Sequence, residues 1–241
     1  MNQHIDTIQA GATAAGRALP HESAHLHVSG QAAYIDDLPE LAGTLHAALG
    51  LSPVAHGRLI AIDVDGLKTQ AGVVAVLTAK DIPGANDCGA IIHDDPILAE
   101  GEVHYLGQPM FVVLSAQRDT ARRVAAMAKD FVQIAPLPAL LTPEAAHAAQ
   151  RYVVPPMHMQ RGDAAQALAQ APHRLRGQFH LGGQEQFYLE GQIAYAIPKE
   201  GQGLLVHSST QHPSEMQLAI AHALNLNAHH VQVECRRMGG G

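Results

Sequence analysis

The sequence predicts an α+β protein with a compact first domain and the beginning of a second one. Short apolar runs typical of strands occur in both halves of the chain, whereas helical patterns are few and brief. A stretch rich in proline and alanine, residues 136–156, separates the halves. We therefore expect an N-terminal arm over residues 1–29, a compact domain over 30–138, a linker over 139–160 and the start of a second domain over 161–241.

The first half is expected to hold a mixed sheet and one helix. Apolar residues alternate with polar ones from Ile60 onwards, and Val73–Thr78 is a continuous apolar run of the kind found in strands buried on both faces. A helix is predicted over residues 118–129, because Ala121, Val124, Ala125 and Ala128 recur at helical spacing. The expected strands cover residues 33–39, 44–51, 58–65, 73–78, 111–114 and 131–134.

The second half begins with short helices and continues with strands. Helices are predicted over residues 143–150 and 162–171, the latter capped by Asp163, and a longer one opens at Pro213 and runs to about residue 224. Strands are expected over residues 173–180, 192–197, 203–208 and 231–235. The last strand leads into a run of glycines. Because the predicted sheet is only partial, we expect it to leave apolar surface uncovered.

Composition narrows the class of protein. The chain has 241 residues, 47% of them hydrophobic, and a net charge of −7, so it offers no basic stripe for nucleic acid. No apolar run approaches the roughly 20 residues of a membrane span, and a cytoplasmic location is expected. Two distant cysteines favour neither a disulfide framework nor an iron–sulfur site. The seventeen histidines show no metal-binding spacing, even at His25 and His27 or at His229 and His230.

Two glycine-bearing loops are the candidate ligand sites. Gln184 follows Gly182 and Gly183, and its neutral amide can both donate and accept hydrogen bonds beside an oxo-bearing cofactor. Gly240 and Gly241 follow the last strand, where backbone N–H groups can face an anion. A glutamine that satisfies loop backbone and a glycine linker are the alternative interpretations.

No catalytic constellation accompanies these loops. Glu102, Glu185 and Glu190 are the carboxylates that could act as general bases, but nothing in the sequence pairs any of them with a nucleophile or a metal. A solvated carboxylate is the expected state of each. The sequence also lacks a nucleophile elbow and a Cys/His arrangement of known spacing.

Taken together, the loops resemble the molybdenum-binding subunit of the xanthine dehydrogenase/aldehyde oxidase family. Residues 181–190, LGGQEQFYLE, are similar to the family segment GGQEHFYLE, and residues 237–241, RMGGG, match the start of RMGGGFGGKE. These motifs stand in the family order, about fifty residues apart. Residues 16–24 and 28–39 and Gly107-Gln108-Pro109 extend the resemblance over nearly the whole chain. The Asp36–Pro39 stretch favours the xanthine dehydrogenase branch.

The resemblance implies a small α/β "hammerhead" domain followed by the incomplete first part of a molybdopterin-binding domain. Gln184 resembles the glutamine whose amide lies against the molybdenum oxo group, and Gly240 and Gly241 resemble the loop beside the cofactor's dithiolene. Family members hydroxylate a purine or aldehyde carbon with oxygen from water. Electrons leave through two [2Fe–2S] clusters to FAD, here expected on a partner subunit, within a heterotetramer.

The family continues past RMGGG, and its catalytic base and substrate-orienting arginine lie in that later region. The chain is therefore expected to be an N-terminal fragment that is inactive alone. The leading hypothesis is part of a xanthine dehydrogenase that oxidises purines to urate. The alternatives are an aldehyde or N-heterocycle oxidoreductase of the same family, and a non-enzymatic interaction module built on the first domain.

Overall fold

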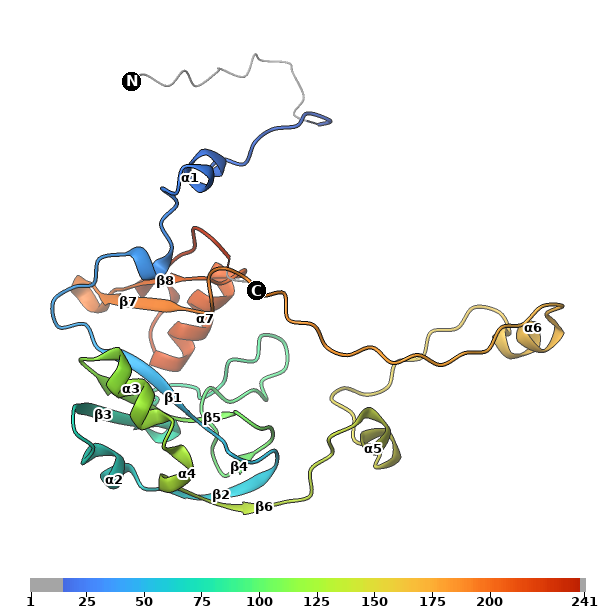
Figure 1. Ribbon diagram of the computed structural model, residues 1–241, viewed down its shortest axis with the longest axis horizontal. Helices are drawn as coiled ribbons and strands as arrows, with labels where there is room; N and C mark the ends of the chain where they lie inside the picture. The colour runs from blue at the N-terminus through green and yellow to red at the C-terminus, as the bar shows by residue number, and fades with distance from the viewer. Residues whose placement is uncertain (1–14, 239–241) are drawn as a thin grey trace.

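The computed structural model describes residues 15–238 (Figure 1). The first packed unit runs from β1 to β6, residues 46–136, and the second from β7 to β9, residues 194–234. A long extended segment between them, residues 137–193, is called the excursion. The first unit contains two three-stranded sheets, and the second unit contains one. Short helices α5 (Pro143–Ala148) and α6 (Ala164–Gln170) lie on the excursion, away from both units. Within residues 15–238, no helix combines the length and the apolar character needed to cross a bilayer.

The first unit packs helices and sheets around one core. One antiparallel sheet has the order β1 (His46–Leu51), β5 (Pro109–Ser115), β3 (Val73–Thr78). The other has the order β4 (Glu102–Val103), β2 (Gly57–Ile62), β6 (Val132–Pro136). Helices α2 (Val64–Lys68), α3 (Arg118–Ala125) and α4 (Ala128–Phe131) complete it. The fully buried side chains include Leu67, Val103, Met110, Phe111, Val113 and Val124.

The predicted mixed sheet is wrong, because all strand pairs in the first unit are antiparallel. The strand over 73–78 has the predicted bounds but is not buried on both faces. It lies at the edge of its sheet, where Val74 is 58% exposed. The run at 111–114 is the central strand β5, which therefore receives partners on both sides.

One predicted strand is absent and another is shortened, in each case because an aspartate side chain accepts a hydrogen bond from a nearby backbone N–H. In place of a strand over 33–39 there is a 3-10 helix, η1 (Ile35–Asp37), in which the Tyr34 N–H donates to the Asp37 carboxylate at 2.9 Å. The strand over 58–65 stops at Ile62 because Asp63 accepts the Gly66 N–H at 2.9 Å and caps α2. A bulge between Leu59 and Ala61 also shifts the register of β2 against β6, so the alternation expected from Ile60 is broken.

The predicted helix over 118–129 is divided. Helix α3 ends at Ala125 and α4 begins at Ala128, so Met127 lies between them. The apolar face is nevertheless as predicted, since Ala121, Val124, Ala125 and Ala128 are all buried. The short 3-10 helix η2 (Ala79–Asp81) follows β3, and residues 85–101 contain no helix or strand, as expected.

The second unit is a βαβ arrangement with one added strand. Strand β8 (Leu204–Ser208) pairs antiparallel with β7 (Ala194–Pro198) and parallel with β9 (Val231–Glu234). A parallel pair needs a crossover, and α7 (Pro213–Leu224) supplies it, with the predicted start and end. The 3-10 helices η3 (Glu200–Gln202) and η4 (Ala228–His230) occupy the connections.

The predicted strand over 173–180 is absent, because this part of the excursion has no neighbouring strand to pair with. Apolar side chains in this stretch and just after it remain in solvent: Phe179 is 83% exposed, Leu181 80% and Phe187 94%. The second half therefore has uncovered apolar surface, as expected, but these residues lie on the excursion and not on the partial sheet to which the expectation assigned it. Asp163 caps α6 as predicted, accepting the Gln166 N–H at 2.9 Å.

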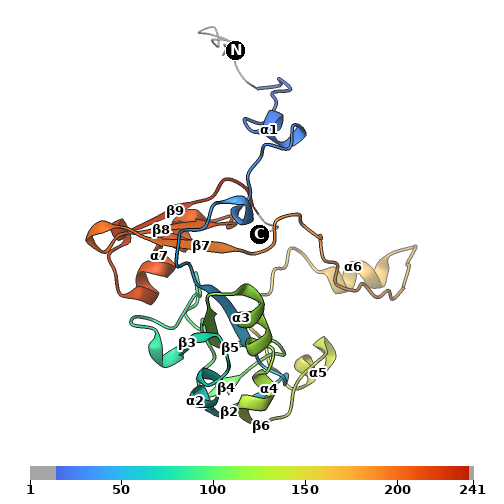
Figure 2. The ribbon, with the colours of Figure 1, turned by 60° about the vertical axis from the view of Figure 1, so that its left-hand side comes forward.

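The two units meet at the C-terminal end of α7. Figure 2 shows α7 on the side of its sheet that faces the first unit. The N–H groups of Gly84 and Ala85 donate to the carbonyls of Ala223 and His222 at 2.9 and 3.0 Å, so the loop supplies donors to carbonyls at the end of the helix. A β-carbon at Gly84 would lie 1.9 Å from the His222 carbonyl oxygen, so only glycine allows this approach.

Replacing Gly84 with alanine should separate the units at this point. We expect Gly84→Ala to lower the free energy of unfolding by about 1–3 kcal/mol, the usual cost of forcing extra atoms into a packed contact. The amides of residues 84 and 85 should also exchange faster with deuterium. Gly177→Ala is the matched control, because a β-carbon there meets nothing within 4 Å. Equal exchange in the two variants would contradict this account of the contact.

Candidate functional site

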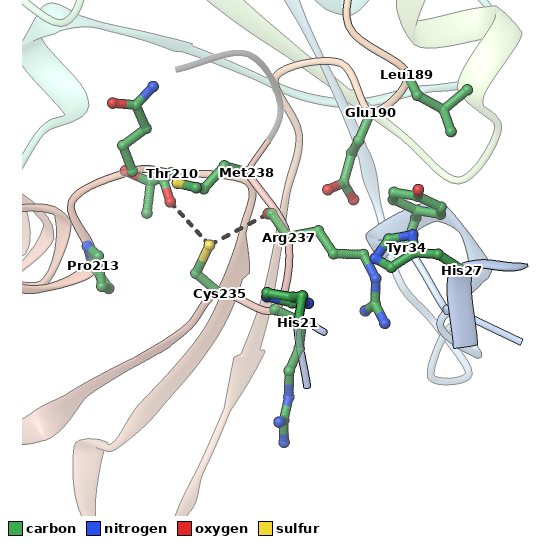
Figure 3. A pocket seen from close by; sticks show the side chains of 12 residues that line it. His21, His27, Tyr34, Leu189, Glu190, Thr210, Pro213, Cys235, Arg237 and Met238 are labelled. Atoms are coloured by element: carbon green, nitrogen blue, oxygen red, sulfur yellow. Dashed lines mark hydrogen bonds between the residues drawn. The ribbon is translucent and has the colours of Figure 1, made fainter. Parts of the chain in front are cut away.

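A cleft of about 500 Å³ lies at the end of β9 (Figure 3). Four segments meet there: the N-terminal segment around α1 (Ala24–Val28), the chain just before β7, the turn from β8 into α7, and the residues after β9. Its lining residues are His21, His27, Tyr34, Leu189, Glu190, Thr210, Gln211, Pro213, Cys235, Arg236, Arg237 and Met238. A smaller hollow of about 330 Å³ adjoins it and shares Tyr34, Glu190, Arg236 and Arg237.

Arg237 connects the end of β9 to the N-terminal segment. One terminal nitrogen of its guanidinium donates to the Ala33 carbonyl at 2.6 Å, and the guanidinium carbon lies 5.6 Å from the centre of the Tyr34 ring. The buried Nε has no hydrogen-bond partner among the described residues. A buried donor without a partner costs about 1–3 kcal/mol. An oxygen-rich, anionic group fits such a donor.

Cys235 fastens the turn before α7 to the end of β9. Its Sγ lies 2.9 Å from the Thr210 carbonyl and 3.3 Å from the Arg237 carbonyl, contacts drawn as dashed lines in Figure 3. Burial raises the pKa of this thiol, and the nearby negative charge of Glu190 raises it further. The thiol therefore stays protonated at neutral pH and acts as a hydrogen-bond donor, in contrast to the low-pKa thiolates that serve as nucleophiles or metal ligands.

Glu190 is not the solvated carboxylate that the sequence suggested. It is only 9% exposed, and its carboxylate accepts the Ile35 N–H at 2.8 Å. The first residue of η1 is thereby held against the start of the second unit. Glu102 is also engaged, in a hydrogen bond with His56 at 2.7 Å, whereas Glu185 is exposed as expected. The sequence motif LGGQEQFYLE drew attention to Glu190, which ends it. The sequence could not predict its hydrogen-bond partner, Ile35, which lies 155 residues away.

The predicted site residues are placed as follows. Gln184 is exposed, in the part of the excursion that leads to the cleft and reaches it at Leu189 and Glu190. Gly240 and Gly241 lie outside the described residues, and Arg237 and Met238, which precede them, line the cleft. The expectation from the family resemblance, that Gln184 and these glycines belong to one cofactor site, stays a prediction. Sequence reasoning missed Tyr34 and Thr210, whose roles arise only from long-range packing.

Two family models match the chain. Residues 29–134 match the model described as "Aldehyde oxidase and xanthine dehydrogenase, a/b hammerhead domain". Residues 145–241 match the model described as "Molybdopterin cofactor-binding domain". These matches confirm the predicted fold class, a hammerhead domain followed by part of a molybdopterin-binding domain.

Individual proteins are similar over most of the chain. A xanthine dehydrogenase from Oryza sativa subsp. japonica is 37% identical over 95% of this chain and 17% of its own length. The aldehyde oxidoreductase from Desulfovibrio gigas has a TM-score of 0.78 and 26% identity, covering 92% of this chain and 26% of that one. Quinoline 2-oxidoreductase from Pseudomonas putida 86 has a TM-score of 0.73 and 26% identity, covering 92% and 30%. The chain thus spans about 17% of the length of the curated relatives it matches.

Removing the Glu190 carboxylate should release the N-terminal segment from the cleft. We expect Glu190→Ala to speed amide exchange at Ile35 and to lower the free energy of unfolding by about 1.5–3 kcal/mol, as for a hydrogen bond to a charged acceptor. Glu190→Gln keeps an acceptor oxygen and should show a smaller change. Glu185→Ala, at an exposed position of the same motif, is the control. If the Ile35 amide exchanges at the same rate in Glu190→Ala and Glu185→Ala, the hydrogen bond between Glu190 and Ile35 does not hold the N-terminal segment.

Proposed function

The chain belongs to the xanthine dehydrogenase/aldehyde oxidase family, and from that premise we propose that it is part of a molybdenum hydroxylase that oxidises purines. In this proposal the first unit is a scaffold and the cleft is one wall of the cofactor site. The observation that carries it is a convergence. The two motifs, separated by about fifty residues, both reach the same cleft, one through Leu189 and Glu190 and the other through Arg237 and Met238.

The cleft suits an anionic cofactor because an arginine side chain, which is a cationic hydrogen-bond donor, lines it. Arg237 has a guanidinium donor without a partner among residues 15–238, and the phosphate and oxo groups of a molybdenum cofactor are acceptors. The residues that would hold the cofactor are Gln184, Gly240 and Gly241. The cofactor, when bound, supplies the redox chemistry.

This chain's own residues would bind and orient. The Gln184 side chain is a neutral donor that can hydrogen-bond an oxo group without adding charge to the metal centre, so it would sit against the cofactor rather than bind the metal. Glycines after a strand let backbone N–H groups approach a bulky ligand closely. The protonated Cys235 and the buried Glu190 would hold the surrounding turns in place.

The proposal extends to partners. We place the [2Fe–2S] clusters and FAD on a separate iron–sulfur/FAD subunit, and the assembled enzyme is a heterotetramer. The chain has only two cysteines, Cys88 and Cys235, and the raised pKa of each disfavours the thiolate form that iron–sulfur ligands need. The catalytic base and the substrate pocket would be contributed by other parts of the assembled enzyme.

Gln184 can be tested in the assembled enzyme. We expect Gln184→Ala to lower turnover about 10–100-fold, the usual effect of removing a group that supports a metal centre, while molybdenum content stays at one per subunit. Gln178→Ala, in the same exposed segment, should leave the rate unchanged. An unchanged rate in Gln184→Ala at full molybdenum loading would remove this residue from the site.

A second candidate is an oxidoreductase acting on aldehydes or N-heterocycles. The structural likeness to an aldehyde oxidoreductase and to quinoline 2-oxidoreductase favours it. The assembled enzyme should be assayed with xanthine, an aromatic aldehyde and quinoline at matched concentrations. We expect the highest kcat/KM for xanthine, and a preference of tenfold or more for either other substrate would replace the purine assignment by the second candidate.

A further inference from the structure

A cluster of two histidines and a glutamate lies away from the cleft. His56 directly precedes β2, Glu102 begins β4, and His104 directly follows β4. Figures 1 and 2 place β2, β4 and β6 at the end of the first unit that points away from the β7–β8–β9 sheet. One ligand atom from each of the three residues lies within 4.8 Å of the others. In residues 15–238 no other group of this kind is found.

The backbone holds the three side chains in position. Strand β2 pairs with β4 so that Gly57 lies opposite Val103 and Arg58 opposite Glu102, which brings His56 and His104 to the same end of the pair. The His104 N–H donates to the side chain of Gln108 at 2.7 Å, and Gln108 is only 1% exposed. The His56 carbonyl accepts the Leu137 N–H at 3.0 Å. The cluster therefore rests on fixed elements, which a metal site requires.

His56 is oriented as metal-binding histidines are. Its Nδ1 lies 2.6 Å from the Pro138 carbonyl, while its Nε2 faces the Glu102 carboxylate at 2.7 Å. A carbonyl that accepts from one ring nitrogen fixes the ring and leaves the other nitrogen for a metal. A metal ion would replace the proton on Nε2.

The two separations that involve Glu102 are close to those around a small divalent ion, and the ligand nitrogens of His56 and His104 lie within 4.8 Å of each other. Tetrahedral zinc bonds of roughly 2.0–2.2 Å hold ligand atoms about 3.3–3.5 Å apart. The Glu102 oxygen lies 2.7 Å from Nε2 of His56 and 3.7 Å from Nδ1 of His104. Both separations reach the tetrahedral value by shifts of under about 1 Å. The two imidazole rings are nearly parallel, with centroids 6.2 Å apart, and His104 is exposed enough to turn.

We propose that His56, Glu102 and His104 form a binding site for a divalent transition-metal ion of the zinc class, with a remaining position open to water. Two imidazoles and one carboxylate favour zinc, cobalt, nickel or copper over calcium and magnesium, which prefer all-oxygen sites. Bound metal would tie the two-residue strand β4 to the residues before β2. The site is independent of the proposed molybdenum chemistry, since it lies on the first unit.

Cobalt and zinc binding to the whole chain test the proposal. After treatment with a chelator, one equivalent of Co²⁺ should give the intense visible absorption of a low-coordinate site, and Zn²⁺ should displace it. His104→Ala should weaken binding of that equivalent at least about tenfold. His93→Ala is the matched control: His93 also pairs with a carboxylate, Asp87, at 2.7 Å but has no third ligand beside it among the described residues. This variant should bind as the unchanged chain does.

Equal cobalt affinity in His104→Ala and the unchanged chain would overturn the proposal, as would equal losses in His104→Ala and His93→Ala. A measurement without substitution gives a second test. Substoichiometric Co²⁺ should broaden the ring NMR signals of His56 and His104 before those of His93. Simultaneous broadening of all three would overturn the proposal in favour of general binding by surface histidines. Neither experiment depends on molybdenum, so its result is separate from the assignment of a hydroxylase.

Discussion

The cleft depends on two charged side chains whose partners are backbone atoms of the N-terminal segment. Glu190 accepts the Ile35 N–H, and Arg237 donates to the Ala33 carbonyl. A charged group taken out of water is costly unless it is hydrogen-bonded, so each of these side chains fixes the position of the segment that satisfies it. The contacts join residues 155 and 204 positions apart. Without them, the wall formed by Tyr34 would have no fixed relation to the end of β9.

The same logic explains how the two units are joined. A helix leaves its last carbonyls without internal partners, and the loop after η2 supplies two N–H groups to the end of α7. Gly84 permits this approach because it has no β-carbon. The orientation of the second unit is thus set at the end of the helix that connects β8 to β9. Since β9 leads into the cleft, the first unit also influences the cleft, although it contributes little to its lining.

The family assignment and the uncovered surface are consistent with one another. The chain spans about 17% of the length of its curated relatives, and the excursion carries exposed aromatic and aliphatic side chains such as Phe179 and Phe187. Apolar surface of this extent is characteristic of regions that pack against further protein. The LGGQEQFYLE motif, residues 181–190, lies within this segment. Its function in the proposed enzyme would depend on such packing.

Local sequence determined the elements whose signals are short-range. The bounds of β3 and α7, the cap at Asp163 and the buried face of α3 follow from apolar spacing and capping chemistry. The two motifs also identified the family, because they are contiguous in sequence. Predictions were wrong where a local aspartate bond displaced a strand, at Asp37 and Asp63, and where no partner strand was at hand, over 173–180.

Tertiary structure alone decided which side chains meet. The pairing of Glu190 with Ile35, of Arg237 with Ala33 and of His56 with Glu102 joins residues that nothing in the sequence links. Strand partners and sheet edges are undetermined by the sequence for the same reason, so the prediction of a strand buried on both faces is wrong for β3. A residue's own propensity reports on its neighbours within a few positions, whereas the partner of a buried charge is chosen by how the whole chain packs.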